Sequence, residues 1–376
     1  MKRAVWSRAR RPTFALLLIL TASTVATGQS PCAFTPAESH FAHVDLQASF
    51  QWFEDQFSPP HTSASTGTLL VNATEIYDSA ASGYRLDGKC QASTGPTGVN
   101  ATLSGSGDLK SYLEKGDTFT IGALTLHYVL SQGLEGELTG GLGIGRFRDV
   151  TPLAKAIRIQ DRFLDEGILL GPIPAGRLQT LAQVIDAVDL SSSARLTAIE
   201  QEIVATGLTQ GDALGARALT EIEDVLASTE EARLCGWEVQ ARAGLAVSAV
   251  PEPRLSEAIA FSWHYAAVPD PVSQWQASAD WVSGLALLDR YSLAGSISYS
   301  RRIGDALRVR GSYDLSRDLL WNTSHTTPFD HHELQATLIS QLSAQLSLTV
   351  SLQFVLETGY EQPTKTLSVQ LSYDAL

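Results

Sequence analysis

Apolar side chains occupy every second position over most of this chain, and this alternation restricts the fold more than any other feature. Between Leu346 and Phe354, five apolar residues alternate with serine, threonine and glutamine. Because successive side chains of a β-strand point to opposite faces, such a segment forms a strand with one apolar and one polar face. The pattern predicts eight strands in the C-terminal part, over 237–249, 259–265, 274–281, 293–300, 307–315, 334–338, 345–356 and 367–373. It predicts six more in the N-terminal part, over 43–52, 64–77, 83–93, 98–112, 118–130 and 134–147.

Two features favour a membrane-spanning sheet over a soluble sandwich, whose strands also alternate. The segment 344–357 is long enough to cross a bilayer when tilted. Aromatic residues typical of a membrane interface stand near strand ends, namely Trp237, Trp275, Trp281, Tyr299 and Tyr313. The sequence therefore predicts a mostly β protein, an antiparallel transmembrane β-barrel of about 14 strands, with 12 as the alternative. We expect the barrel to close, because an open sheet edge in hydrocarbon leaves backbone groups unpaired.

The first 28 residues have the composition of a cleaved signal peptide. Five basic residues precede the apolar run Phe14–Leu20, and Ala26-Thr27-Gly28 fits the small-x-small pattern of a cleavage site. We therefore expect export, with Gln29 as the first residue of the mature chain. Without these five residues, 22 basic residues remain against 40 acidic ones, a formal charge of −18. This balance argues against nucleic acid as a partner, because phosphate binding needs a basic face.

Three cysteines follow the signal segment: Cys32, Cys90 and Cys235. In an oxidising compartment two of them can form one disulfide, and the sequence leaves the pair open. None belongs to a C-x-x-C pair, so we expect no structural zinc site.

Between residues 151 and 233 the period changes to that of helices. Leu178, Leu181, Ala182, Ile185 and Val188 recur at helical spacing, and similar runs predict a bundle of about four helices. The chain is thus divided into a signal peptide (1–28), a first part of the barrel (29–150), the helical insert (151–233) and a second part of the barrel (234–376). We expect the insert either to hang below the barrel in the periplasm or to fill the lumen as a plug.

Alternate glycines precede the insert. Gly141, Gly143 and Gly145 leave one face of their strand without side chains, whereas Leu142 and Ile144 face lipid. Our hypothesis is that helices of the insert pack against this bare lumenal face.

The polar faces supply candidate lumen residues. Arg308, Arg310 and Asp314 share the polar face of one strand, and His264 lies on the polar face of another. Such groups could bias ion selectivity or pair with the insert. The run Asp330–Glu333 contains metal-binding residue types, but neighbours on a strand point to opposite faces, so we expect no metal site. No serine is singled out as a nucleophile, so we predict neither an enzyme nor a cofactor.

The connections between predicted strands alternate in length. Residues 268–271, 303–305 and 341–344 are tight, whereas the polar stretch 320–333 is long. Transmembrane barrels have short periplasmic turns and longer outer loops, so the insert should lie on the periplasmic side.

The signal peptide, the alternation of Leu367, Val369, Leu371 and Tyr373, and the strand pairs joined by tight turns resemble bacterial outer-membrane β-barrel proteins. The resemblance implies location in the outer membrane, contact with lipid and insertion by the barrel-assembly machinery. It implies a porin-like channel or a structural role. The alternatives are a soluble exported β-protein that binds a ligand or surface partner, and an outer-membrane hydrolase. The oligomeric state stays open.

Overall fold

The computed structural model describes residues 31–36, 38–55, 62–95, 98–113, 116–130, 133–187, 191–227, 233–248, 254–284, 291–304, 306–319, 329–342, 346–358 and 363–373. The predicted signal peptide lies outside these residues. The strands are β1 (Glu38–Asp55), β2 (Thr62–Ser79), β3 (Ser82–Gly95), β4 (Gly98–Tyr112), β5 (Thr118–Val129), β6 (Gly133–Asp149), β7 (Leu234–Ser248), β8 (Arg254–Asp270), β9 (Ser273–Ser283), β10 (Tyr291–Ile303), β11 (Leu307–Leu319), β12 (Phe329–Gln341), β13 (Leu346–Glu357) and β14 (Thr364–Tyr373). A short 3-10 helix, η1 (Pro31–Ala33), precedes them.

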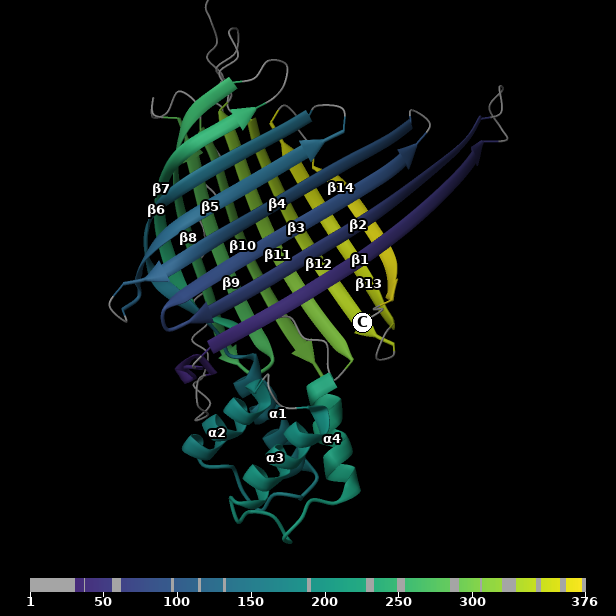
Figure 1. Ribbon diagram of the computed structural model, residues 1–376. Helices are drawn as coiled ribbons and strands as arrows, with labels where there is room; N and C mark the ends of the chain where they lie inside the picture. Colours follow the sequence, from purple (N-terminus) through teal and green to yellow (C-terminus); the bar gives the residue numbers. More distant parts are fainter. Residues whose placement is uncertain are drawn as a thin grey trace, which may run out of the picture.

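These strands form one antiparallel sheet in which each strand pairs with its neighbours in sequence. Figure 1 shows the sheet rolled around an interior, with β1–β6 as the near wall and the green and yellow strands behind it. Fourteen strands are therefore confirmed for the described residues, six before the helical insert and eight after it.

The two edges of the sheet differ from the expected closure. Within the described residues, β1 pairs with β2 alone and β14 with β13 alone, so no ladder joins the two ends. The edge strands also differ in length, with 18 residues in β1 and 10 in β14. A ladder of hydrogen bonds between them would therefore pair the backbone groups of only part of the edge of β1.

The two faces of the sheet have opposite chemistry. Along β7, Trp237 and Val239 are 47% and 40% exposed on the outside, whereas Glu238 and Gln240 between them are 1% and 4% exposed on the inside. The same outward exposure of large apolar side chains recurs around the sheet, at Val44, Leu103, Leu138, Phe261, Ile297, Val309, Leu334, Leu352 and Leu367, among others. The predicted alternation is thus confirmed, with the apolar face outward.

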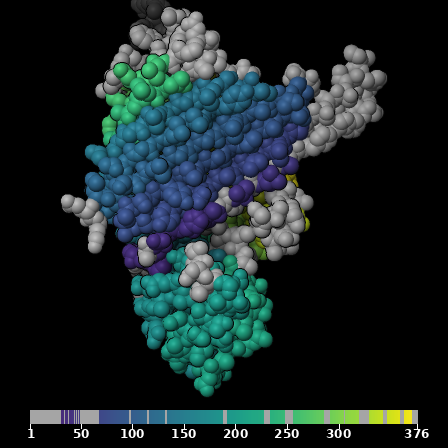
Figure 2. All heavy atoms as spheres, viewed as in Figure 1, coloured from purple at the N-terminus to yellow at the C-terminus, as the bar shows by residue number. Residues whose placement is uncertain are grey.

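The helical insert forms a small bundle beyond one end of the sheet (Figure 1). It contains α1 (Thr151–Asp165), α2 (Ala175–Asp186), α3 (Ser192–Val204) and α4 (Ala216–Ala227). Buried side chains at helical spacing, such as Leu153, Ala156, Ile159 and Phe163 in α1, build its core. Figure 2 shows the teal insert below the lower end of the rolled sheet. None of the helices in the described part of the chain is long and apolar enough to cross a membrane.

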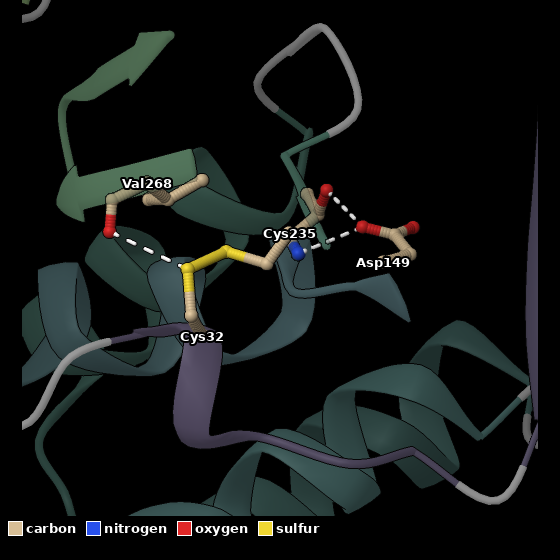
Figure 3. The surroundings of a disulfide bond; sticks show 5 residues. Cys32, Asp149, Cys235 and Val268 are labelled. Carbon is tan, nitrogen blue, oxygen red and sulfur yellow. Dashed lines mark hydrogen bonds between the residues drawn. A yellow bond between two sulfur atoms is a disulfide. The ribbon is translucent and has the colours of Figure 1, made fainter. Parts of the chain in front are cut away.

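The N-terminal segment is fixed to the junction between the sheet and the insert. A disulfide joins Cys32 to Cys235 at the start of β7, with a Cα–Cα distance of 5.3 Å (Figure 3). Phe34 is buried in the same apolar cluster as the insert helices. Cys90 is the free thiol among the described cysteines and is exposed on β3.

The disulfide predicts the outcome of peptide mapping without reduction. The expected product is a single cross-linked peptide pair that contains Cys32 and Cys235, with Cys90 recovered as an alkylated thiol. A Cys90→Ser variant is the control and should contain no alkylated cysteine. Recovery of Cys90 in a disulfide would contradict the structure.

Candidate functional site

The interior face of the rolled sheet holds the predicted lumen residues. His264 on β8 lies between the outward side chains Trp263 and Tyr265, and its Nε2 is 3.3 Å from Asp280 Oδ1 on β9. On β11, Arg308, Arg310 and Asp314 alternate with the outward residues Val309 and Tyr313. All four predicted residues therefore lie on the inner face. His264 is on β8, whereas Arg308, Arg310 and Asp314 are together on β11.

A row of carboxylates continues from Asp314. Asp314 is the register partner of Glu333 on β12. Glu333 Oε1 accepts a hydrogen bond of 2.7 Å from Gln353 Nε2, and Glu333 Oε2 lies 3.7 Å from His331 Nε2. The other ring nitrogen of His331, Nδ1, is 3.1 Å from Glu357 Oε1 on β13. Three carboxylates, those of Asp314, Glu333 and Glu357, thus lie in the same part of the inner face.

The run Asp330–Glu333 divides between the two faces of β12, as the alternation predicts. His332 points outward, where its Nδ1 is 2.8 Å from the hydroxyl of Tyr313. In the part of the chain that the structure describes, no three His, Cys, Asp or Glu side chains are arranged to hold a metal ion.

An ion-pair cluster on the inner face of the opposite wall was not predicted. We use this name for Asp78, Lys110, Tyr112, Arg146 and Glu238. Lys110 Nζ is 2.6 Å from Glu238 Oε2, and both side chains are largely buried. Tyr112 donates a hydrogen bond of 2.6 Å to Asp78 Oδ1, and the Arg146 guanidinium lies 3.5 Å from Asp78 Oδ2 and stacks over the Tyr112 ring at 3.8 Å.

The glycine run of β6 explains how these side chains meet. Lys110 lies on β4 and Glu238 on β7, so two strands separate them. A Cβ atom at Gly141 would stand 2.0 Å from the carbonyl oxygen of Ala241 on β7, so the bare α-carbon permits a close approach of the two backbones. The tight curl brings the inner faces of β4 and β7 within reach of one ion pair.

The hypothesis that helices pack against these glycines is wrong. The ring of Phe119 on β5 covers Gly143, where a Cβ atom would lie 2.2 Å from the ring. Lys110 Nζ in turn lies 5.3 Å from the centre of the Phe119 ring. Gly145 adopts a φ of +110°, which bends the strand end. An aromatic side chain of the sheet itself therefore fills the bare face, and the insert lies beyond the sheet end.

The insert is attached to the end of the rolled sheet where β6 ends and α1 begins. The backbone N–H of Asp149 donates to Ser39 Oγ on β1 at 3.4 Å. The Asp149 carboxylate accepts hydrogen bonds from the N–H and hydroxyl of Thr151, and the Thr151 hydroxyl accepts one from the backbone N–H of Arg233. This network, with the adjacent disulfide (Figure 3), fixes the first turn of α1 to β1, β6 and β7.

Cationic groups concentrate at the same junction. Lys155 Nζ donates to the carbonyl oxygen of Leu226 at 2.9 Å. Burial, together with the charges of Arg158, Arg195 and Arg302, lowers the pKa of Lys155 to about 8, against the opposing effect of Asp149. Arg302 belongs to β10, so the basic groups of α1 and α3 stand close to the insert-side end of the sheet.

The comparisons with known proteins show resemblance in structure alone. No family model matches the sequence, and no curated protein matches it. The structure resembles OccK2 (OpdF) of Pseudomonas aeruginosa with 9% identity and a TM-score of 0.34, over 88% of this chain and 97% of that one. It resembles a loop L8 deletion mutant of OmpT, an outer membrane protein of Vibrio cholerae, with 7% identity and a TM-score of 0.33, over 90% and 99%. The translocator domain of the autotransporter NalP from Neisseria meningitidis matches with 8% identity and a TM-score of 0.26, over 90% and 88%.

The buried pair predicts a large effect of a single substitution. In Glu238→Gln the ammonium of Lys110 loses its partner inside the sheet, so the free energy of unfolding should fall by about 3–5 kcal/mol. Urea unfolding in lipid vesicles measures the change. Asp87→Asn is the matched control, because its pair with Arg85 is far more exposed and should be worth about 0–1 kcal/mol. Equal losses in both variants would contradict the burial of the cluster.

The stability of the insert should depend on pH through the carboxyl group of Asp186 at the end of α2. Burial, together with the charge of Asp149, raises the pKa of Asp186 to about 6, against the opposing effect of Arg195. The folded insert therefore holds a proton that the unfolded chain releases, and its stability should fall as the pH rises from about 4 to about 6. Thermal melts of the full chain, followed by helical circular dichroism, measure this slope. Asp186→Asn should flatten it, whereas Asp224→Asn at an exposed position should not.

Proposed function

We propose that this chain is an integral bacterial outer-membrane protein whose rolled sheet forms a passage for small polar solutes. The proposal rests on the distribution of side chains between the two faces of the sheet, which is the reverse of that in a soluble protein. Large apolar side chains are exposed on the outer face of strands all around the described sheet, whereas Glu238, Gln240, Ser262 and Gln274 are buried on the inner face. In water an exposed apolar surface of this extent is unfavourable, but in hydrocarbon it is the stable arrangement.

Aromatic rings on the outer face support a membrane interface near the insert. Tyr77 on β2 stacks on Tyr84 on β3 with ring centres 5.4 Å apart, and Trp275 on β9 packs against Tyr299 on β10 at 4.6 Å. All four residues lie close to the insert-side ends of their strands. Tyrosine and tryptophan prefer this position, since one part of the ring is apolar and the other is polar.

The strand connections support an orientation. At the end of the sheet that carries the insert, β8 is followed by β9 after two residues and β10 by β11 after three. At the opposite end, β11 ends at Leu319 and β12 begins at Phe329. We therefore place the insert in the periplasm and the longer connections outside the cell. The partners of this proposal are membrane lipid and the barrel-assembly machinery.

The soluble alternative is disfavoured by the direction of the apolar face. A soluble β-protein would bury that face between two layers, and here it is the polar face that is enclosed. The proposal includes no catalytic role.

Two neighbouring substitutions test the membrane assignment. Ile297 points outward on β10 and Ser298 inward. Ile297→Arg should lower the yield of folding into lipid vesicles, because an arginine on the lipid face costs about 2–4 kcal/mol at mid-bilayer. Ser298→Arg adds the same charge to the polar interior and should fold nearly as well as the parent chain. Folding is measured by the difference in gel mobility between heated and unheated samples.

Conductance tests the passage itself. The folded parent protein in a planar bilayer should give discrete steps of ion current. A correctly folded, inserted sample that gives none would refute the passage while leaving the membrane assignment intact.

A further inference from the structure

A polar cluster of His40, Glu75 and Tyr84 interrupts the apolar outer face of the sheet near the insert. Glu75 on β2 is the register partner of Leu86 on β3, which points outward, so the carboxylate lies on the same face. Its side chain is 39% exposed. Glu75 Oε1 lies 3.0 Å from His40 Nε2 and accepts a hydrogen bond of 2.8 Å from the Tyr84 hydroxyl. No described residue forms a hydrogen bond or ion pair with the second carboxylate oxygen, Oε2.

Glu75 lies on the hydrocarbon side of the aromatic residues at the proposed membrane interface. The stacked rings of Tyr77 and Tyr84 belong to register partners two positions closer to the insert. On the described outer face of β1–β5, the other charge-bearing side chains in the insert-side half are Glu38 and His40. Histidine is charged only when it is protonated, so the cluster is negative when His40 is neutral. A carboxylate that faces hydrocarbon is unfavourable, and charged groups in such places mark functional sites.

An apolar groove adjoins this carboxylate on the side away from the insert. It has a volume of about 490 Å³, and register partners on three neighbouring strands form its floor, namely Ala73, Gly88 and Gly105. The same row continues to Val44 on β1 and Leu126 on β5, which stand at the two sides of the groove. The strands that carry it belong to the near wall in Figure 1.

The two glycines of the floor are not required by the backbone. Neither of them has a positive φ. A Cβ atom at Gly88 would lie 4.0 Å from the Cβ atom of Ala73, and one at Gly105 would lie 3.8 Å from the carbonyl oxygen of Asp87, which are ordinary contact distances. At Gly141, by contrast, a Cβ atom would overlap the backbone of β7. Side chains would therefore fit over the floor of the groove, and the sequence leaves this space open.

We propose that the polar cluster and the groove together bind one lipid of the surrounding membrane, with an ammonium headgroup at Glu75 and an acyl chain over Gly88 and Gly105. This inference rests on the proposed function, because it requires the outer face to contact lipid. The ammonium complements the charge of Glu75 and can donate a hydrogen bond to Oε2. The headgroup then lies near the aromatic residues and the chain extends towards the middle of the membrane, as in a lipid of the periplasmic leaflet.

A second copy of this chain fits the groove less well. A two-fold dimer brings the same surface of both copies together, so the two grooves would face each other and enclose an empty space. Atoms that line such a space lose their van der Waals contacts. A flexible acyl chain can instead follow the groove and contact its floor.

Native mass spectrometry tests the headgroup. The full chain is folded into vesicles of phosphatidylethanolamine and phosphatidylglycerol in equal amounts, with identical acyl chains, and is then released in a mild detergent. The parent protein should retain one lipid and should prefer the ethanolamine lipid about tenfold, as expected for one hydrogen bond between charged groups. Glu75→Gln should remove this preference. Glu257→Gln, at an exposed position on the outer face of β8, should not.

Side chains added to the floor of the groove test the position of the acyl chain. Gly88→Val with Gly105→Val should reduce the amount of retained lipid about tenfold or more, because the chain loses its contacts with the floor. The matched control is Gly295→Val with Gly311→Val, on the outer faces of β10 and β11, where a Cβ atom meets no listed neighbour closer than 3.6 Å. This control should retain lipid as the parent does. If the groove variant does not fold, Glu75→Gln still tests the inference.

The possible outcomes separate the inference from the proposed function. Equal retention of the two lipids, or a preference that survives Glu75→Gln, would overturn the lipid site. A dimer that Gly88→Val with Gly105→Val abolishes would assign the groove to a second copy and would also overturn it. Insertion of each sample is checked by the difference in gel mobility between heated and unheated protein. A parent chain that does not insert would instead refute the proposed function, and the inference with it.

Discussion

The structure depends on which face of the sheet meets which surroundings. Strands that alternate apolar and polar side chains can bury either face, and the two choices give a soluble sandwich or a membrane barrel. Here the polar residues are enclosed, as at Glu238 and Gln240, and large apolar side chains such as Trp237 are exposed. In water this exposed apolar surface would be unfavourable, whereas in the hydrocarbon of a membrane it is stable. In the proposed membrane location, the edges of β1 and β14, which pair with no further strand among the described residues, must also be covered.

The curl at β6 and β7 connects the sheet to the insert. Glycine at positions 141 and 145 lets the two backbones approach and bend, so Lys110 reaches Glu238 across two strands. The same bend carries the end of β6 towards Ser39 on β1, where the disulfide and Thr151 fix the first helix. The position of the insert outside the sheet is therefore a consequence of backbone geometry in two strands. Phe119 completes the arrangement by filling the space that the glycines leave.

Local features of the sequence predicted much of the fold. Alternation identified all fourteen strands and the correct outward face, and helical spacing located the insert, because both patterns depend on near neighbours in the chain. It also placed His264, Arg308, Arg310 and Asp314 on the inner face. The Lys110–Glu238 pair could not be predicted, since its members are 128 residues apart and meet only after the sheet curls. Cys32 and Cys235 likewise come together through the fold, across 203 residues.

Quenching of tryptophan fluorescence tests the direction of the apolar face most directly. Trp237, Trp263 and Trp275 lie on the outer face and are half-exposed. In vesicles whose acyl chains carry bromine, their emission should be strongly quenched, whereas iodide in the aqueous phase should have little effect. Strong quenching by iodide together with weak quenching by the brominated chains would show that these side chains do not contact lipid, and the membrane-embedded sheet would be contradicted.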